Sequence, residues 1–452
     1  MNALLQYLDL YREHRATIDA HAPEALNALR QQAFDTLMRL GRLPERGDEG
    51  FEKISVNDMF APDFGLNLTR LPFTADRRTE FSCAVPHIGA IAAAMVVNDS
   101  FVPGRDLGDG HLPEGLEVMS LARAAELYPD LAVGQETLPA DNAVVALNSL
   151  LVQDGVFVRV RRGVCIERPV QLLSIFIAAG MPVMAVRRLR IVVEDGARLS
   201  VLTCEHPRPG GADTDTLSCR NVDITLGRDA ALNFYDLEEA GPRAMRASVL
   251  GARQNTGSSL NICSVFVGGG ITRNEYHVGH DGESCRTSLR GLVIGGGNQV
   301  IDNASYVVHS RPRCVSDQLF KYALFDSAQG AFEGLVSVLG TATFTDARQT
   351  NRNLLCSPDA RMHTMPQLII NCDEVKASHG ATIGQLDDRA LFYMRSRGIP
   401  LDEARMMLTN AFLTDVLDAI GLEALRDRLR HLVDKRLRGC GSAACDNCSL
   451  RP

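Results

Sequence analysis

Two stretches, DGVFVRVRRG (154–163) and RLRIVVEDGARLSVL (188–202), decide the fold. In the first stretch every second residue from Val156 to Val160 is a valine, and the residues between them are larger or charged. The second stretch shows the same alternation on both sides of an Asp-Gly pair. A period of two is typical of β-strands, and Asp-Gly pairs mark tight turns. The sequence therefore predicts short strands joined by turns.

The same texture continues from about residue 140 to residue 380. Further turn signals interrupt it, among them Asp281-Gly282 and the glycine triplet at 295–297. No helix-length periodic segment lies between the strands, which argues against a doubly wound α/β domain with a helix at each crossover. A sandwich, a barrel and a β-solenoid all remain open, because the intervals between turns are too uneven to show a strict repeat.

Helical patterns flank this β region on both sides. Apolar residues recur at helical spacing within the first 45 residues, and three more helices are expected after residue 385, ending near Gly398, Gly421 and Gly439. The apolar stripes of the last helices are wide enough to pack on the chain's own core or on a partner.

We expect three regions in the chain. They are an N-terminal helical region and connector (1–135), a β core (136–384), and a C-terminal helical region with a cysteine-containing tail (385–452).

Composition excludes several classes of protein. The chain has 452 residues, 45% of them hydrophobic, and a net charge of −8 without a long basic run, which argues against nucleic-acid binding.

The N-terminal stretch lacks the apolar segment of an export signal, so we expect a cytoplasmic protein with reduced cysteines. The longest uncharged runs, 81–98 and 172–186, do not read as membrane spans. There is no G-x-x-x-x-G-K-[ST] motif for ATP hydrolysis.

Three polar clusters stand out within or at the end of the β region. They are HSRPRCVSDQLFK (309–321), DARQTNRN (346–353) and KASHGAT (376–382). Such clusters on strands are either hydrogen-bonded stacks that fix the strand register or parts of a functional site. His379 lies between small residues, so its imidazole is expected to be accessible, although a lone histidine also commonly has a structural role.

The tail carries a second candidate site. Cys440, Cys445 and Cys448 could reach one metal ion or cluster if a fourth ligand came from elsewhere. The alternative is an exposed tail with incidental thiols. The tail therefore keeps open an accessory metal-binding function.

The last two polar clusters carry a recognisable pattern. The stretch TDARQTNRNLLCSPDARMHTMPQLIINCDEVKASHGATIGQLDDRALFYMRSRGIP (345–400) strongly resembles the SufB/SufD family of iron–sulfur cluster assembly proteins. Within it, SHGATIGQLD (378–387) is most similar to the SufD branch. HSRPRCVSDQLFKYAL (309–324) and the opening QYLDLYREHR (6–15) also resemble the family.

This resemblance implies a fold and a function. The fold would be mainly β, with a right-handed parallel β-helix core flanked by N-terminal and C-terminal α-helical regions. The protein would be a scaffold subunit of the SUF machinery without enzyme activity of its own. It would pair through the β-helix with a SufB-like subunit, or in isolation with a second copy of itself. Its C-terminal helices would hold a SufC-like ATPase in a complex of one SufB, two SufC and one SufD.

The resemblance also assigns a role to His379. It matches a family histidine implicated in building the nascent cluster at the SufB–SufD interface, where imidazole can bind iron beside thiolates of the partner. Many relatives carry a cysteine two positions earlier, where this chain has Ala377. A transient iron–sulfur cluster is expected at that interface, and none is expected to be bound stably by this chain alone.

Two further sets of residues stay open as alternatives. Cys314, Cys356 and Cys372 could pass sulfur or could be structural cysteines of the β region. Asp302, Asp317 and Asp346 are candidate carboxylates of a β-helix carbohydrate-active enzyme. The absence of Trp and an aromatic content of 6% argue against that enzyme, because sugars commonly stack on aromatic rings.

Overall fold

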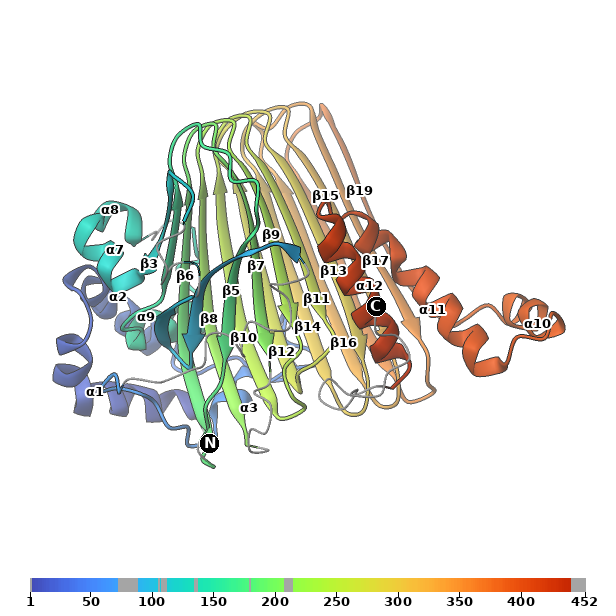
Figure 1. Cartoon of the computed structure of the whole chain (residues 1–452), viewed down its shortest axis with the longest axis horizontal. Helices are drawn as coiled ribbons and strands as arrows, with labels where there is room; N and C mark the ends of the chain where they lie inside the picture. Colours follow the sequence, from blue (N-terminus) through green and yellow to red (C-terminus); the bar gives the residue numbers. More distant parts are fainter. Residues whose placement is uncertain are drawn as a thin grey trace.

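Two long sheets run along the molecule, and helices lie at both ends of the chain (Figure 1). The structure is a computed structural model that describes residues 2–71, 88–104, 106, 112–133, 137–178, 180–206 and 214–439.

From β4 (Val156–Val160) onward, the chain alternates between the two sheets, so that each pair of successive strands forms one rung of a solenoid. The ten-stranded sheet has the order β19 (Val375–Gly384), β17 (Thr345–Leu355), β15 (Val315–Leu324), β13 (Arg286–Gly295), β11 (Ser259–Phe266), β9 (Ala231–Glu238), β7 (Arg198–His206), β5 (Val170–Ile175), β1 (Ile91–Val97) and β2 (Ser100–Pro103). The nine-stranded sheet has the order β18 (Arg361–Ile370), β16 (Gln329–Val338), β14 (Val300–His309), β12 (Ile271–His280), β10 (Ala244–Gln254), β8 (Thr216–Leu226), β6 (Val183–Val193), β4 and β3 (Leu116–Ser120).

Neighbouring strands are parallel throughout, apart from the antiparallel pairs β1–β2 and β3–β4 at the N-terminal end. The predicted parallel β-helix is therefore confirmed. β1, β2 and β3 come from the connector that precedes the predicted β core, and they extend both sheets at that end.

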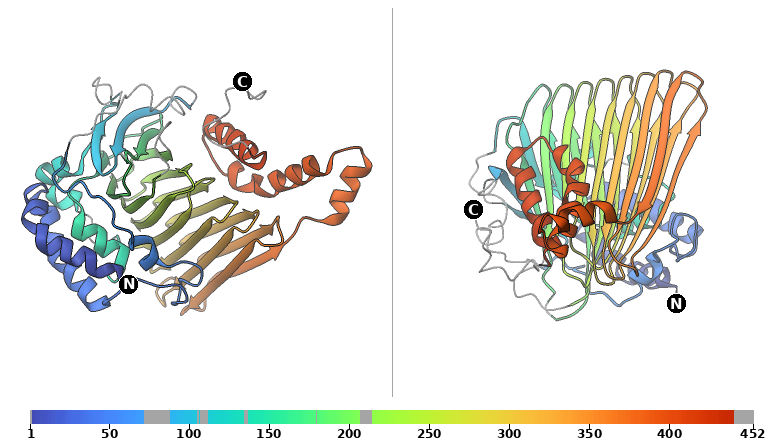
Figure 2. Two further views of the ribbon diagram at one scale, coloured as in Figure 1. Left: turned by 90° about the horizontal axis from the view of Figure 1, so that it is seen from below. Right: turned by 90° about the vertical axis from the view of Figure 1, so that its right-hand side faces the viewer.

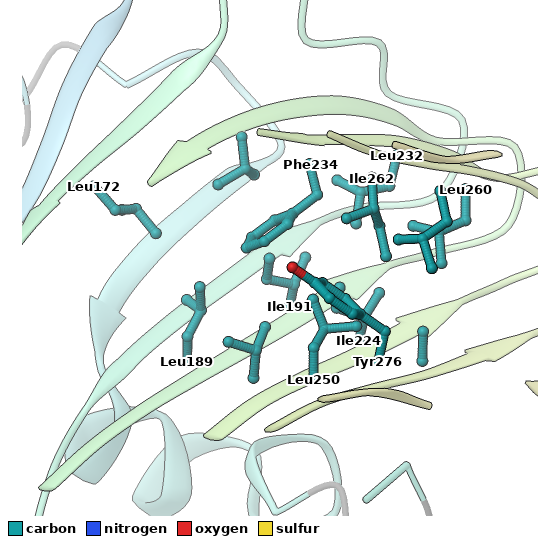
Figure 3. Close-up of a cluster of buried hydrophobic side chains, with 14 of the residues drawn as sticks. Leu172, Leu189, Ile191, Ile224, Leu232, Phe234, Leu250, Leu260, Ile262 and Tyr276 are labelled. Atoms are coloured by element: carbon teal, nitrogen blue, oxygen red, sulfur yellow. The ribbon is translucent and has the colours of Figure 1, made fainter. Parts of the chain in front are cut away.

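The interior of the solenoid is filled by stacked apolar side chains (Figure 3). Phe234 on β9 lies in register with Ile262 on β11, which lies in register with Leu289 on β13. Because side chains alternate between the faces of a strand, every second residue of these strands enters the same column. Burial of each such side chain contributes roughly 1.5–3 kcal/mol to folding, so the columns account for much of the stability of the core.

The N-terminal helices cover the outer face of the nine-stranded sheet near its start. They are α1 (Ala3–Ala20), α2 (Glu24–Leu40), α3 (Val56–Phe60), α7 (Leu121–Leu127), α8 (Pro129–Ala132) and α9 (Ala143–Leu151). Their apolar faces share one buried cluster with outward-facing residues of the sheet such as Met184, Leu217 and Ala247. The side chain of Asn142 accepts hydrogen bonds from two amides of α9, which fixes where that helix begins.

The C-terminal region forms α10 (Asp388–Ser396), α11 (Leu401–Asp418) and α12 (Glu423–Leu437). Leu413 of α11 and Leu429 of α12 are buried against the outer face of the ten-stranded sheet, in a cluster that includes Leu292. The stripes of α11 and α12 therefore pack on the chain's own core. α10 has no buried residue and projects away from the solenoid (Figure 2, left). No helix among the described residues is long and apolar enough to cross a membrane.

A buried lysine anchors α11 to the sheet. The Lys321 ammonium donates to the Phe412 carbonyl and to the Asp415 carboxylate, each at 2.6 Å, and it lies 4.9 Å from the centroid of the Phe412 ring. Its side chain is only 2% exposed. The contact joins β15 to α11 through a charge-assisted hydrogen bond.

Charged side chains also enter the interior, on rungs near the middle of the solenoid. Asp236 on β9 pairs with Arg220 and Arg246, and Glu238 lies 3.8 Å from Arg246. Burial alone would raise the pKa of Asp236, but the two guanidinium groups hold it below its usual range. Burial raises the pKa of Glu238 to about 7. The positive charge of Arg246 opposes this shift, and the negative charges of neighbouring carboxylates add to it.

Replacing Lys321 by Met should loosen α11 and α12 without unfolding the solenoid. The Phe412 carbonyl would lose its charged donor, at a cost of roughly 1–3 kcal/mol. Hydrogen exchange should become faster across 401–437 and stay unchanged in β9 and β11. Lys376→Met, which removes the same charge from an exposed position, should leave both regions as in the wild type. Equal exchange in the two variants would contradict an anchoring role for Lys321.

Glu238→Gln should stabilise the protein more at pH 8 than at pH 5. The folded state binds the Glu238 proton more tightly than the unfolded chain does, so the contribution of Glu238 to wild-type stability falls as the pH rises from about 4.5 to about 7. Glutamine does not titrate, so the variant does not lose this stability as the pH rises. Melting temperatures at the two pH values measure the difference, with Glu423→Gln, at an 83% exposed side chain, as the matched control. A pH-independent difference would show that Glu238 titrates as an exposed carboxyl group does.

Candidate functional site

The C-terminal end of the solenoid is open. β18 and β19 are the last strands of the two sheets, and in the described part of the chain no strand follows either of them. Most residues of β19 are exposed, whereas alternate residues of β17 are buried. The edges of both strands therefore leave backbone amide and carbonyl groups free to pair with another chain.

His379 lies on the inner face of this open end. It is in register with the buried Gln349 of β17, which is in register with the buried Gln318 of β15. Gln349 Nε2 donates to Gln318 Oε1 at 3.5 Å. The column thus continues outward through two buried amides and ends at an exposed imidazole, because no further rung covers it. The prediction that the imidazole is accessible is confirmed.

The rest of the last rung is mainly apolar. By their register, Val375, Ala377, Ala381 and Ile383 share the inner face of β19 with His379. Register also places one row of β18 on the inner face, namely Met362, Thr364, Pro366, Leu368 and Ile370. Leu368 and Val375 pack against a small buried cluster around Val336. The apolar core therefore continues to this end, where no further rung of the described chain covers it.

Several polar atoms near this end are buried without a hydrogen-bond partner. They include Gln318 Nε2, Gln349 Oε1, Asn353 Oδ1 and Thr364 Oγ1. Buried polar atoms normally find partners, and atoms left without one are costly. The polar column at the open end is therefore incomplete within this chain alone.

The other predicted site residues do not join His379. Cys314 is buried, Cys356 and Cys372 are partly buried, and Cys440, Cys445 and Cys448 lie outside the described residues. In the described ranges, no group of three or more His, Cys, Asp or Glu side chains is placed to hold a metal ion.

The three carboxylates considered for sugar chemistry are each engaged by an arginine. Asp302 pairs with Arg273, Asp317 with Arg290, and Asp346 with Arg348.

The interior of the solenoid leaves little space for a ligand beside the central charged rungs. A cavity there of about 30 Å³ is lined by residues such as Arg187, Glu205 and Asp236. That volume suits one or two water molecules.

One buried cluster was missed by sequence reasoning. Cys314 and His309 were noticed as part of a polar run, but Cys285 and His280, one rung earlier, were not. A signal was available, because HDGESC (280–285) and HSRPRC (309–314) share the spacing H-x-x-x-x-C.

Comparisons with known proteins agree with this architecture. The profile described as "SUF system FeS cluster assembly, SufBD core domain" matches residues 176–412, and the profile "SufBD protein N-terminal region" matches residues 1–172. An iron–sulfur cluster assembly SufBD family protein of Synechocystis is 29% identical over 90% of both chains.

Two relatives carry the name of one branch of the family. The iron–sulfur cluster assembly protein SufD of Escherichia coli is 36% identical over 39% of this chain and 42% of its own length. The SufD protein of Bacillus subtilis is 24% identical over 66% of this chain and 68% of its own. The resemblance seen in the sequence is thereby confirmed, and the chain belongs to the SufBD family of iron–sulfur cluster assembly proteins.

Proposed function

We propose that this chain is a SufD-like scaffold subunit that presents the open end of its solenoid to a SufB-like partner, with a nascent iron–sulfur cluster as the cargo of their interface. The observation that carries the proposal is the position of His379. Gln349 and Gln318, which precede it in the column, are buried, whereas the His379 imidazole is exposed on the inner face of the last strand. A partner that covered this end would enclose the imidazole.

The partner supplies most cluster ligands in this proposal. One accessible imidazole binds iron but does not hold a cluster alone, and Ala377 offers no thiolate beside it. The chain then acts as a scaffold rather than as an enzyme, and a cluster is present only while the partner contributes thiolates. These features also fit a cytoplasmic protein with free cysteines.

The exposed edges favour pairing by strand addition. β18 and β19 carry exposed apolar residues, with Ile370 43% and Ile383 48% exposed. A SufB-like solenoid could add its own edge strands here, so that backbone hydrogen bonds and apolar contacts continue across the junction. A second copy of this chain would make the same contacts in the absence of that partner.

The C-terminal helices are the proposed platform for a SufC-like ATPase. α10 buries no residue of its own, and Phe392 and Tyr393 are 74% and 60% exposed. Aromatic side chains exposed on a projecting helix are suited to insertion into a partner's groove. Hydrolysis of ATP would then take place on the partner.

His379→Ala should reduce cluster formation several-fold while leaving the complex assembled. The measurement is anaerobic reconstitution with the SufB-like and SufC-like partners, with iron, acid-labile sulfide and ATPase rate recorded on the same samples. His14→Ala, at an exposed position of α1, is the matched control. An unchanged cluster yield with the His379 variant would contradict a role of His379 in cluster formation. The chain would then be a docking subunit only.

Ile383→Asp should abolish pairing with the SufB-like subunit without lowering the melting temperature of the isolated chain. The carboxylate would have to be desolvated at the junction, whereas in the isolated chain it stays in water. Leu127→Asp, at a 45% exposed leucine of α7, is the control. Light scattering after gel filtration reports the pairing. Equal pairing by both variants would place the partner surface elsewhere.

A further inference from the structure

Two cysteines lie next to each other at the turns that precede β13 and β15. Cys285 and Cys314 are both fully buried. Each comes directly before a strand, and the first residues of these strands, Arg286 and Val315, are in register. The Val315 amide donates to the Cys285 carbonyl at 2.8 Å, which fixes the cysteines one rung apart.

This spacing suits a disulfide. Neighbouring strands lie about 4.8 Å apart, and the Cα atoms of disulfide-bonded cysteines are separated by roughly 4.4–6.8 Å. Both sulfur atoms approach the same oxygen, because Cys285 Sγ and Cys314 Sγ lie 3.2 Å and 3.3 Å from the Gly282 carbonyl. A disulfide could therefore form without a large shift of the backbone.

The two thiols have different surroundings. Cys285 Sγ also faces the carbonyl oxygens of Gln254, at 3.6 Å, and Asn255, at 3.2 Å, which favour a thiol that keeps its proton. Its hydrogen bond with Cys314 and its burial raise the pKa of Cys285. The same hydrogen bond holds the pKa of Cys314 below its usual range, and hydrogen bonds with two imidazoles add to this effect.

Those imidazoles belong to His280 and His309, which lie one rung apart with their rings edge to face. Their Nδ1 atoms lie 3.1 Å from each other. His280 Nε2 contacts the Thr287 hydroxyl at 2.8 Å, and His309 Nε2 contacts the Ser316 hydroxyl at 2.9 Å. Burial lowers the pKa of His309 to about 4, so its ring is neutral near pH 7.

We propose that Cys285 and Cys314 form a dithiol site that is oxidised to a disulfide by small hydroperoxides such as hydrogen peroxide. Metal binding is the other chemistry open to cysteine and histidine, but the described residues hold no group of three or more placed for it. The reaction needs no component beyond the two thiols and the peroxide. The oxidant has to be small, because neither sulfur is exposed.

The chemistry proceeds in two balanced steps. The Cys314 sulfur attacks one peroxide oxygen, the O–O bond breaks, and the departing hydroxide takes up the Cys314 proton. The products are a sulfenic acid and water. Cys285 then attacks the sulfenic sulfur, the S–O bond breaks, and the hydroxide leaves with the Cys285 proton as a second water. In total the thiols lose two electrons, and one peroxide becomes two waters.

Peptide mapping of the folded full-length chain tests the site directly. Trypsin should release Cys285 in peptide 274–286 and Cys314 in peptide 314–321, each with one cysteine. After peroxide treatment and alkylation of free thiols, we expect these two peptides to be linked, and the link to disappear with dithiothreitol. Circular dichroism before digestion confirms that the chain is folded.

Three variants separate the roles of the two sulfurs. Cys285→Ser should leave a sulfenic acid on peptide 314–321 that a cyclic diketone traps. Cys314→Ser should leave Cys285 as a free thiol, since its surroundings favour the protonated form. Cys263→Ser, at a lone buried cysteine, is the matched control and should form the 285–314 link at the wild-type rate.

Two results would overturn the proposal. The first is a folded wild type whose peptides 274–286 and 314–321 stay unlinked at peroxide doses that already oxidise exposed methionines such as Met181. The second is a Cys314→Ser variant in which Cys285 is oxidised as fast as in the wild type.

Discussion

In-register stacking of the rungs is the constraint on which the rest of the structure depends. From β8 to β19 the parallel pairs follow one another residue by residue, so each side chain meets a fixed counterpart one rung away. Like residues consequently occupy the same register position on neighbouring rungs, as Asn274 and Asn303 do, and His280 and His309. A slip of one residue in any rung would turn its inner side chains outward and break every column at once.

The same stacking creates both the open-end site and the thiol pair. The side chains of a column are enclosed only where a further rung follows. The side chain on the last rung therefore stays accessible to other molecules, whereas the side chains below it are buried. His379 is such a final member, whereas Gln349, directly below it, is enclosed. In the middle of the solenoid the opposite holds, because stacking forces two thiols and two imidazoles into contact away from water.

Much of the fold could be predicted from the sequence, and the reasons for the gaps are physical. Period-two alternation identified the strands, and the family resemblance chose the β-helix among three all-β architectures. The repeat itself stayed hidden because the register offsets are unequal: Met245 pairs with Ile271, Ile271 with Val300, and Gln329 with Arg361. Loops of different length between rungs accommodate this variation at little energetic cost.

The candidate site was predictable in part for a related reason. Small neighbours indicated that His379 is accessible, but the cause, its place on the last rung, depends on topology that one segment does not reveal. Cys285 and His280 escaped notice because their partners lie a full rung away in the chain. Only the recurrence of H-x-x-x-x-C at two places hinted at that contact.

The two ends of the solenoid differ, and the difference limits how the molecule can assemble. At the N-terminal end, each sheet finishes in a short antiparallel strand, and β2 ends at Pro103, which has no amide to donate. Short edges that contain proline are poor templates for strand addition. If pairing uses the open end only, as proposed, chains cannot add to one another to form a filament. Joining two open ends would use up both, so such a stack would close after two chains.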